Sequence, residues 1–142
     1  MNLYHYVLTG TVLGICSLTD LRHKVVHKKV LILYGLLVLA GCGAAGKLSG
    51  KIILYGMIPG ILCLLVSKIS GQALGYGDSI LILLTGSSLG IQNCVGITIW
   101  AFLCSGLWAL FLVGIKKADK KAEIPFVPFL MIGFVIQMWM IQ

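Results

Sequence analysis

Residues 75–90 read GYGDSILILLTGSSLG and set one acidic side chain, Asp78, between a glycine-rich approach and an apolar run. Gly71, Gly75 and Gly77 precede this aspartate. They form a segment that does not easily become a regular helix and that allows backbone with positive φ. The small residues in the run after Asp78 are typical of membrane helices that pack closely together. A carboxylate at the edge of such a run is costly to desolvate, which predicts a functional residue.

The chain as a whole has the composition of a membrane protein. Of its 142 residues, 59% are hydrophobic and 11% are charged, and the mean hydropathy is +1.05. This is too apolar for a water-soluble domain. At roughly 20 residues per membrane helix, the length allows about six spans and no separate soluble domain. We expect an all-α membrane protein formed by a single domain, residues 1–142. The apolar runs place its spans at about residues 3–19, 30–46, 52–67, 79–91, 94–115 and 125–141.

The basic residues between these runs predict the topology. Nine of the eleven Lys and Arg residues fall in the first, third and fifth connecting loops, and we expect these loops in the cytoplasm and both termini outside. The first basic residue, Arg22, follows the first apolar run, so that run is expected to be a retained span and not a cleaved signal peptide. Topology also explains the formal charge of +7. We therefore expect no nucleic-acid partner, and contact with membrane lipids instead.

The four acidic side chains divide into two pairs. Asp119 and Glu123 lie among the lysines of the fifth loop and are expected to be solvated. Asp20 ends the first apolar run, 58 residues before Asp78 and two complete spans away, so both aspartates should face the cytoplasmic boundary. Two carboxylates a few ångströms apart share one proton. One of them can then activate a water while the other hydrogen-bonds a peptide carbonyl, as in an aspartic protease, with no metal or organic cofactor.

Other interpretations of the same residues stay open. Asp78 is a good N-cap for the fourth span, and Asp20 could cap the cytoplasmic end of the second. His23 and His27 are spaced for a metal pair, but no third ligand is visible and the five cysteines stand singly, so no metal site or disulfide framework is expected.

Three motifs in the chain resemble the type IV prepilin peptidase family, the bacterial membrane-embedded G-x-G-D aspartyl proteases. They are Asp20-Leu21-Arg22, the G-x-G-D of residues 75–78, and IPFVPFL at residues 124–130. The resemblance implies an intramembrane aspartic endopeptidase of the bacterial cytoplasmic membrane. It would remove the basic leader from prepilin-like precursors at the cytoplasmic face, with Asp20 and Asp78 as the catalytic pair. The supporting motif residues it implies are Gly75, Gly77, Arg22, Pro125, Phe126 and Pro128.

The chain departs from the family pattern at several points. It lacks the insert with paired cysteines that accompanies methyltransferase activity, so we expect the short, peptidase-only branch. Val26, His27 and Lys28 stand near where the family has I-P-N, and Ser79 and Ile80 replace a hydrophobic-Lys pair. These departures bear on substrate range.

The third motif contains two prolines. Pro125 suits the first turn of the last span, and Pro128 is expected to bend that span.

Two other functions stay open for this chain. One is an ion- or proton-coupled carrier that uses both aspartates as relays, although carriers place such groups nearer mid-membrane. The other is a non-catalytic assembly subunit of a pilus or secretion apparatus.

Overall fold

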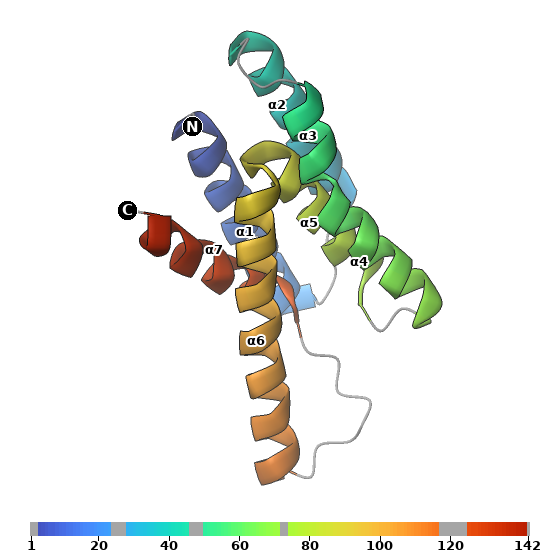
Figure 1. Cartoon of the computed structure of the whole chain (residues 1–142). Coiled ribbons are helices and arrows are strands. Elements are labelled where there is room, and N and C mark those ends of the chain that lie inside the picture. Colours follow the sequence, from blue (N-terminus) through green and yellow to red (C-terminus); the bar gives the residue numbers. More distant parts are fainter. Residues whose placement is uncertain (1–2, 24–27, 46–49, 72–73, 117–124, 142) are drawn as a thin grey trace.

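The computed structural model describes residues 3–23, 28–45, 50–71, 74–116 and 125–141 (Figure 1). Over these residues all regular secondary structure is α-helical, as expected. Each of the six apolar segments becomes helix, and the third is divided into two. The helices are α1 (Leu3–His23), α2 (Lys28–Ala45), α3 (Gly50–Gly56), α4 (Ile58–Ile69), α5 (Tyr76–Leu89), α6 (Ile91–Lys116) and α7 (Val127–Ile141).

The segment expected as one helix over residues 52–67 breaks at Met57. The Met57 N–H still donates to the carbonyl oxygen of Ile53, at 3.1 Å, so the chain direction changes little. Pro59 has no N–H to donate to Tyr55 one turn earlier, and this missing bond is the physical reason for the break. The expected apolar segment is therefore helical, but it forms two helices instead of one.

The turn between α5 and α6 is a single glycine. Gly90 has φ of 82°, a conformation that other residues rarely adopt, and its N–H donates to the carbonyl oxygen of Gly86 at 2.9 Å. The next helix begins immediately, since the N–H of Cys94 donates to the carbonyl oxygen of Gly90 at 3.1 Å. The spans expected at residues 79–91 and 94–115 left Gln92 and Asn93 as the turn, and this is wrong, because both lie in the first turn of α6.

Two glycines in α3 and α4 bring these helices directly onto α5. A Cβ added at Gly86 of α5 would lie 1.9 Å from the carbonyl oxygen of Gly56. A Cβ at Gly60 would lie 2.2 Å from the Cα of Leu83. Close backbone approach through small residues is a common way for membrane helices to associate. The small residues at both ends of GMIPG, residues 56–60, are the sequence signal for this crossing.

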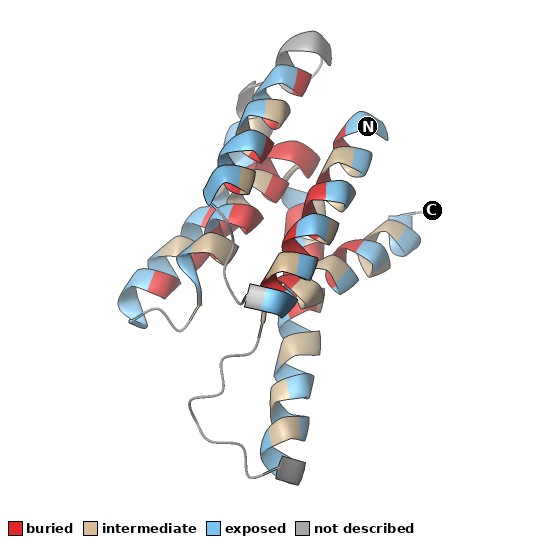
Figure 2. Ribbon diagram, turned by 180° about the vertical axis from the view of Figure 1, so that it is seen from behind, coloured by how far each residue is buried: buried red, intermediate tan, exposed pale blue. Residues whose placement is uncertain are grey.

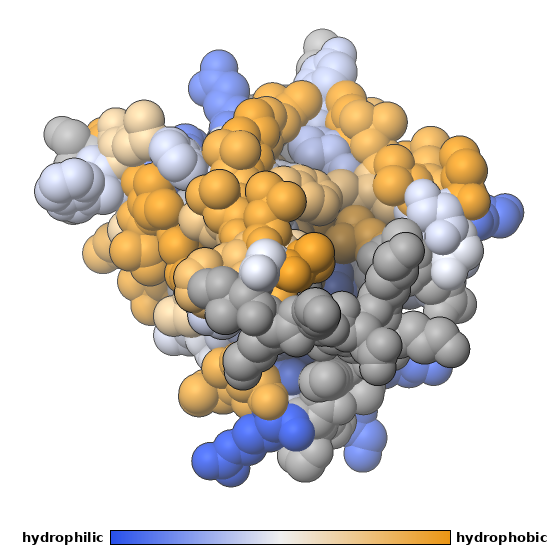
Figure 3. All heavy atoms as spheres, turned by 90° about the horizontal axis from the view of Figure 1, so that it is seen from below, coloured by the Kyte–Doolittle hydropathy of each residue, from blue (hydrophilic) through white to orange (hydrophobic). Residues whose placement is uncertain are grey.

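The helices carry exposed residues along much of their length (Figure 2), and many of these exposed side chains are large and apolar, whereas several polar side chains are buried. Apolar side chains gather over much of the surface seen in Figure 3, and Leu39, Leu110 and Trp139 are 66%, 72% and 83% exposed. Among the described residues, one helical stretch, Ile91–Gly114, is long and apolar enough to cross a membrane by length and composition, and two further apolar helices are shorter. The buried polar side chains are His5, Thr9, Ser17, Asp20, Ser67, Ser79, Thr85, Ser87, Ser88 and Thr98.

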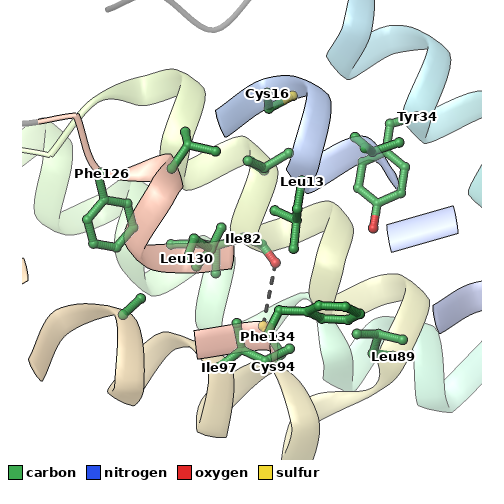
Figure 4. Close-up of a cluster of buried hydrophobic side chains, with 14 of the residues drawn as sticks. Leu13, Cys16, Tyr34, Ile82, Leu89, Cys94, Ile97, Phe126, Leu130 and Phe134 are labelled. Atoms are coloured by element: carbon green, nitrogen blue, oxygen red, sulfur yellow. Dashed lines mark hydrogen bonds between the residues drawn. The ribbon is translucent and has the colours of Figure 1, made fainter. Parts of the chain in front are cut away.

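An apolar core joins α1, α5, α6 and α7, with contributions from α2 and α4 (Figure 4). Leu13 of α1, Ile82 of α5 and Leu130 of α7 are almost without exposed surface. Cys16 of α1 and Phe126, just before α7, lie in the same cluster. This packing fixes the end of α1 against the start of α7, where the candidate site lies.

Candidate active site

Asp20 lies in the last turn of α1 and is only 5% exposed. Its Oδ2 accepts a hydrogen bond of 3.1 Å from the backbone N–H of Val127, the first residue of α7. The first N–H groups of a helix have no partner within the helix, so Asp20 caps α7 from a distant part of the chain. Asp20 is thus a helix cap, as one interpretation held, but the helix that its carboxylate caps is α7 and not the second span.

Asp78 lies in the first turn of α5 and is partly buried. The N-cap of this helix is Gly75, whose carbonyl oxygen accepts bonds from the N–H and the hydroxyl of Ser79, at 3.1 and 3.2 Å. Asp78 is therefore the third residue of the helix, and the interpretation of it as the N-cap is wrong. Its carboxylate is left available for other interactions.

The glycines before Asp78 differ in their backbone. Gly71 has φ of 60°, as expected of a glycine-rich segment, whereas Gly75 has φ of −58° and ψ of 137°, which any residue can adopt. Gly77 lies inside α5, so the expectation of irregular backbone is wrong there. Gly75 has another reason to lack a side chain, because a Cβ would lie 3.0 Å from Oδ2 of Asp78. It leaves room for the carboxylate.

Ser67 of α4 anchors the segment that leads into α5. Its side chain is fully buried, and its hydroxyl donates a short hydrogen bond to the carbonyl oxygen of Leu74. This bond fixes the chain one residue before Gly75. Sequence reasoning missed Ser67, since a single hydroxyl at the end of an apolar run carries no distinct signal.

The structure brings the two aspartates within electrostatic range of each other and of the Cys16 thiol, one turn before Asp20. Both carboxylates stand just outside the apolar runs 3–19 and 79–91. Burial first, and then the charge of Asp20, raises the pKa of Asp78 to about 7. Burial also raises the pKa of Asp20, while the N–H of Val127 opposes that rise. Such a pair holds one proton near neutral pH.

The PFVPF segment, residues 125–129, lies against Asp20 in a slightly different register from the one expected. Pro125 precedes α7, and Pro128 is its second residue, so Pro128 and not Pro125 occupies the first turn. At that position the missing N–H leaves no helical bond unmade, and there is no reason for a bend. Phe126 is buried, and its ring lies 5.2 Å from that of Phe102 on α6, centroid to centroid.

Arg22, the other expected motif residue, does not join the pair. Its side chain is exposed, and two residues along a helix from Asp20 it points to a different side of α1. Within the described part of the chain, no group of three or more His, Cys, Asp or Glu side chains is suited to a metal ion. His27, Asp119 and Glu123 lie outside the described residues.

Two neighbouring carboxylates that share a proton are the arrangement of an aspartic peptidase. The model of the type IV leader peptidase family matches residues 7–110, which include both Asp20 and Asp78. The chain therefore belongs to the type IV leader peptidase family, as its motifs indicated, and the family is one of aspartic-type peptidases. The PFVPF segment lies beyond the matched residues. No curated protein and no solved structure matches the chain.

Proposed function

We propose that this protein is an intramembrane aspartic endopeptidase that removes the basic leader from prepilin-like precursors at the cytoplasmic face of the bacterial membrane. Asp20 and Asp78 are its catalytic pair. The observation that supports this most directly is that two carboxylates, 58 residues apart in sequence, lie within electrostatic range of each other in a chain of the leader peptidase family. Of the chain's four acidic side chains, these two lie at the ends of apolar helices.

The reaction needs one proton on the pair at the start. The ionised carboxylate takes a proton from a water as its oxygen bonds to the peptide carbonyl carbon, and the protonated carboxyl gives its proton to the carbonyl oxygen. The resulting diol collapses when the first carboxyl protonates the amide nitrogen and the second takes back the hydroxyl proton. The C–N bond breaks, and the pair returns to its initial state.

The distribution of polar and apolar groups supports a position within the membrane. A bilayer solvates apolar side chains, so exposed residues such as Leu110 and Trp139 need no protein partner there, while polar groups turn inward. We propose six crossings, with α3 and α4 together forming the third, and both termini outside. Figure 1 shows the N-terminal end of α1 and the C-terminal end of α7 on the same side of the bundle.

The direct test is cleavage of a co-expressed prepilin-like precursor, followed by its change in mobility on a gel. Asp20→Asn and Asp78→Asn are each expected to abolish processing while the protein accumulates normally in the membrane. Asp119→Asn makes the same chemical change outside the pair and should process like the parent. Processing that survives in either of the first two variants removes that aspartate from the mechanism.

A further inference from the structure

We propose that the backbone N–H of Val127 positions Asp20 as the general base of the pair and leaves Asp78 as the group that carries the shared proton. This inference rests on the proposed endopeptidase function and assigns a distinct role to each carboxylate. It starts from the 3.1 Å hydrogen bond between the N–H of Val127 and Oδ2 of Asp20. Val127 is fully buried and Asp20 nearly so, which makes this bond difficult for water to replace.

The local sequence makes this N–H available. Phe126 occupies the N-cap position, where its carbonyl oxygen accepts bonds from Phe129 and Leu130 at 3.0 and 3.1 Å, but its side chain cannot cap the helix. Pro128 has no N–H at all. Val127 is thus left with a donor that no group in α7 can satisfy, and the carboxylate of Asp20 from α1 supplies the acceptor.

The hydrogen bond gives the two carboxyls different protonation states. An N–H can only donate, so it favours the ionised form of Asp20. It also offsets the position of Asp20 in the last turn of α1, where the helix dipole disfavours negative charge. The carboxylate of Asp78, by contrast, accepts no hydrogen bond from the described residues. The asymmetry therefore places the charge on Asp20 and the proton on Asp78.

The surrounding charges agree with this assignment. Burial and the charge of Asp20 raise the pKa of Asp78 to about 7, whereas the N–H of Val127 acts to lower the pKa of Asp20. Among the described residues, the charged or titratable side chains at this end are Cys16 and Arg22 on α1, Lys28 and Lys29 on α2, Lys68 on α4, and Tyr76 and Asp78 on α5. All of the basic ones are exposed, and α7 has no charged or titratable side chain.

Val127→Pro removes the donor with little other change. Proline is favoured at the first position of a helix, and the residue before it, Phe126, is at the N-cap, where extended backbone is usual. Val127→Ala is the matched control, since it loses the side chain and keeps the N–H. Cleavage of a leader peptide substrate by the purified enzyme is measured for both across a range of pH.

We expect Val127→Pro to lower kcat by about 10- to 100-fold, the range for a lost hydrogen bond to a charged group. The acid limb of its pH–rate profile should move to higher pH, because that limb reports the carboxyl that must be ionised. Val127→Ala should keep the parent's profile. If Val127→Pro does not accumulate, replacement of the same amide by an ester removes only the N–H and should shift the limb in the same direction.

The two levels of the proposal fail in different ways. If the acid limb does not shift in the variant that lacks the Val127 N–H, while Asp20→Asn and Asp78→Asn are inactive, the proposed role of Val127 is wrong. The proposed peptidase function then still stands. Cleavage by either aspartate variant overturns the proposed function itself. A purely structural role for Val127 would lower the amount of active enzyme and leave the pH profile where it was.

Discussion

At the scale of single residues, the candidate site depends on the absence of a side chain at Gly75, next to the carboxylate of Asp78. Gly75 adopts φ of −58°, so its backbone does not require glycine, and yet a Cβ there would lie 3.0 Å from Oδ2 of the carboxylate. That distance is shorter than ordinary van der Waals contact. Glycine is thus required at this position because it leaves room for the carboxylate, and not because of its conformational freedom.

Gly75→Ala is therefore expected to lower activity without loss of stability. The carboxylate must move by a few tenths of an ångström, and we expect a loss of about tenfold in kcat, since small displacements of catalytic groups are costly. The free energy of unfolding should stay constant or rise by up to about 1 kcal/mol, as for a glycine with compatible φ. Gly71→Ala is the opposite control: at φ of 60° it should lower stability and leave the carboxylate in place. Full activity in Gly75→Ala would contradict this account.

The proximity of the two aspartates could be predicted from sequence, and the hydrogen bond of Asp20 could not. Two expected spans between Asp20 and Asp78 would return the chain to the same side, and this parity argument needs only local hydrophobicity. The partner of Asp20 is Val127, 107 residues away, and it depends on how α7 packs against α1. No local pattern near Asp20 encodes that packing. The segment containing Val127 was noted as a motif, but its donor was not anticipated.

At the scale of helices, the crossing of α3 and α4 over α5 determines where Asp78 lies. Gly56 and Gly86 meet backbone to backbone, with Gly60 one turn further along against Leu83. Because α5 carries Asp78 in its first turn, any separation of these helices also displaces the site.

Gly86→Ala should lower the free energy of unfolding by about 3 kcal/mol, the upper end of the usual range for overpacking, because the added Cβ meets a carbonyl oxygen that cannot move alone. Gly106→Ala on α6 is a close control, since nothing lies within 4 Å of its Cβ position. Unfolding by SDS titration of the purified protein measures both. Equal stability of the two variants would show that the backbones are not in contact at Gly86.

Apolar segments were predictable at this scale because hydrophobicity is a property of each stretch of chain. The positions at which helices end were harder to predict. Pro59 divides the third segment, and Gly90 alone makes the turn that Gln92 and Asn93 were expected to form. In both places a single residue determines where a helix ends, while the average hydropathy of the surrounding segment changes little.

At the scale of the whole molecule, polar contacts lie within the interior at one end of the bundle. The hydroxyl of Thr9 on α1 is within hydrogen-bonding distance of Tyr34 on α2, at 2.9 Å, and of Ser88 on α5, at 3.2 Å. Nδ1 of His5 lies 3.2 Å from the same Ser88 hydroxyl. This network ties three helices together at the opposite end of α1 and α5 from the two aspartates. Hydrogen bonds between helices are one means by which membrane bundles hold together.

The proposed topology makes a further prediction about reporter fusions. Alkaline phosphatase, which is active only outside the cytoplasm, should be inactive when fused after Lys24 or Gln72 and active when fused after Lys47 or Gln142. The physical reason is that basic loops stay in the cytoplasm, and that α1, α2 and the α3–α4 pair each cross the bilayer once. Fusions after Lys24 and Gln72 follow Asp20 and precede Asp78, so they report the side on which each aspartate lies.

The third crossing is the critical one, because its apolar helical stretch, Ile53–Ile69, is short for a span. From Gly50 to Ile69 the chain would extend about 30 Å if the Met57 turn continues the helical rise, which matches the thickness of the hydrocarbon core. Activity after Gln72 but not after Lys24 would mean that this pair of helices does not return to the cytoplasm. The two carboxylates would then face opposite sides of the membrane, and their meeting in the bundle, with the peptidase mechanism built on it, would be wrong.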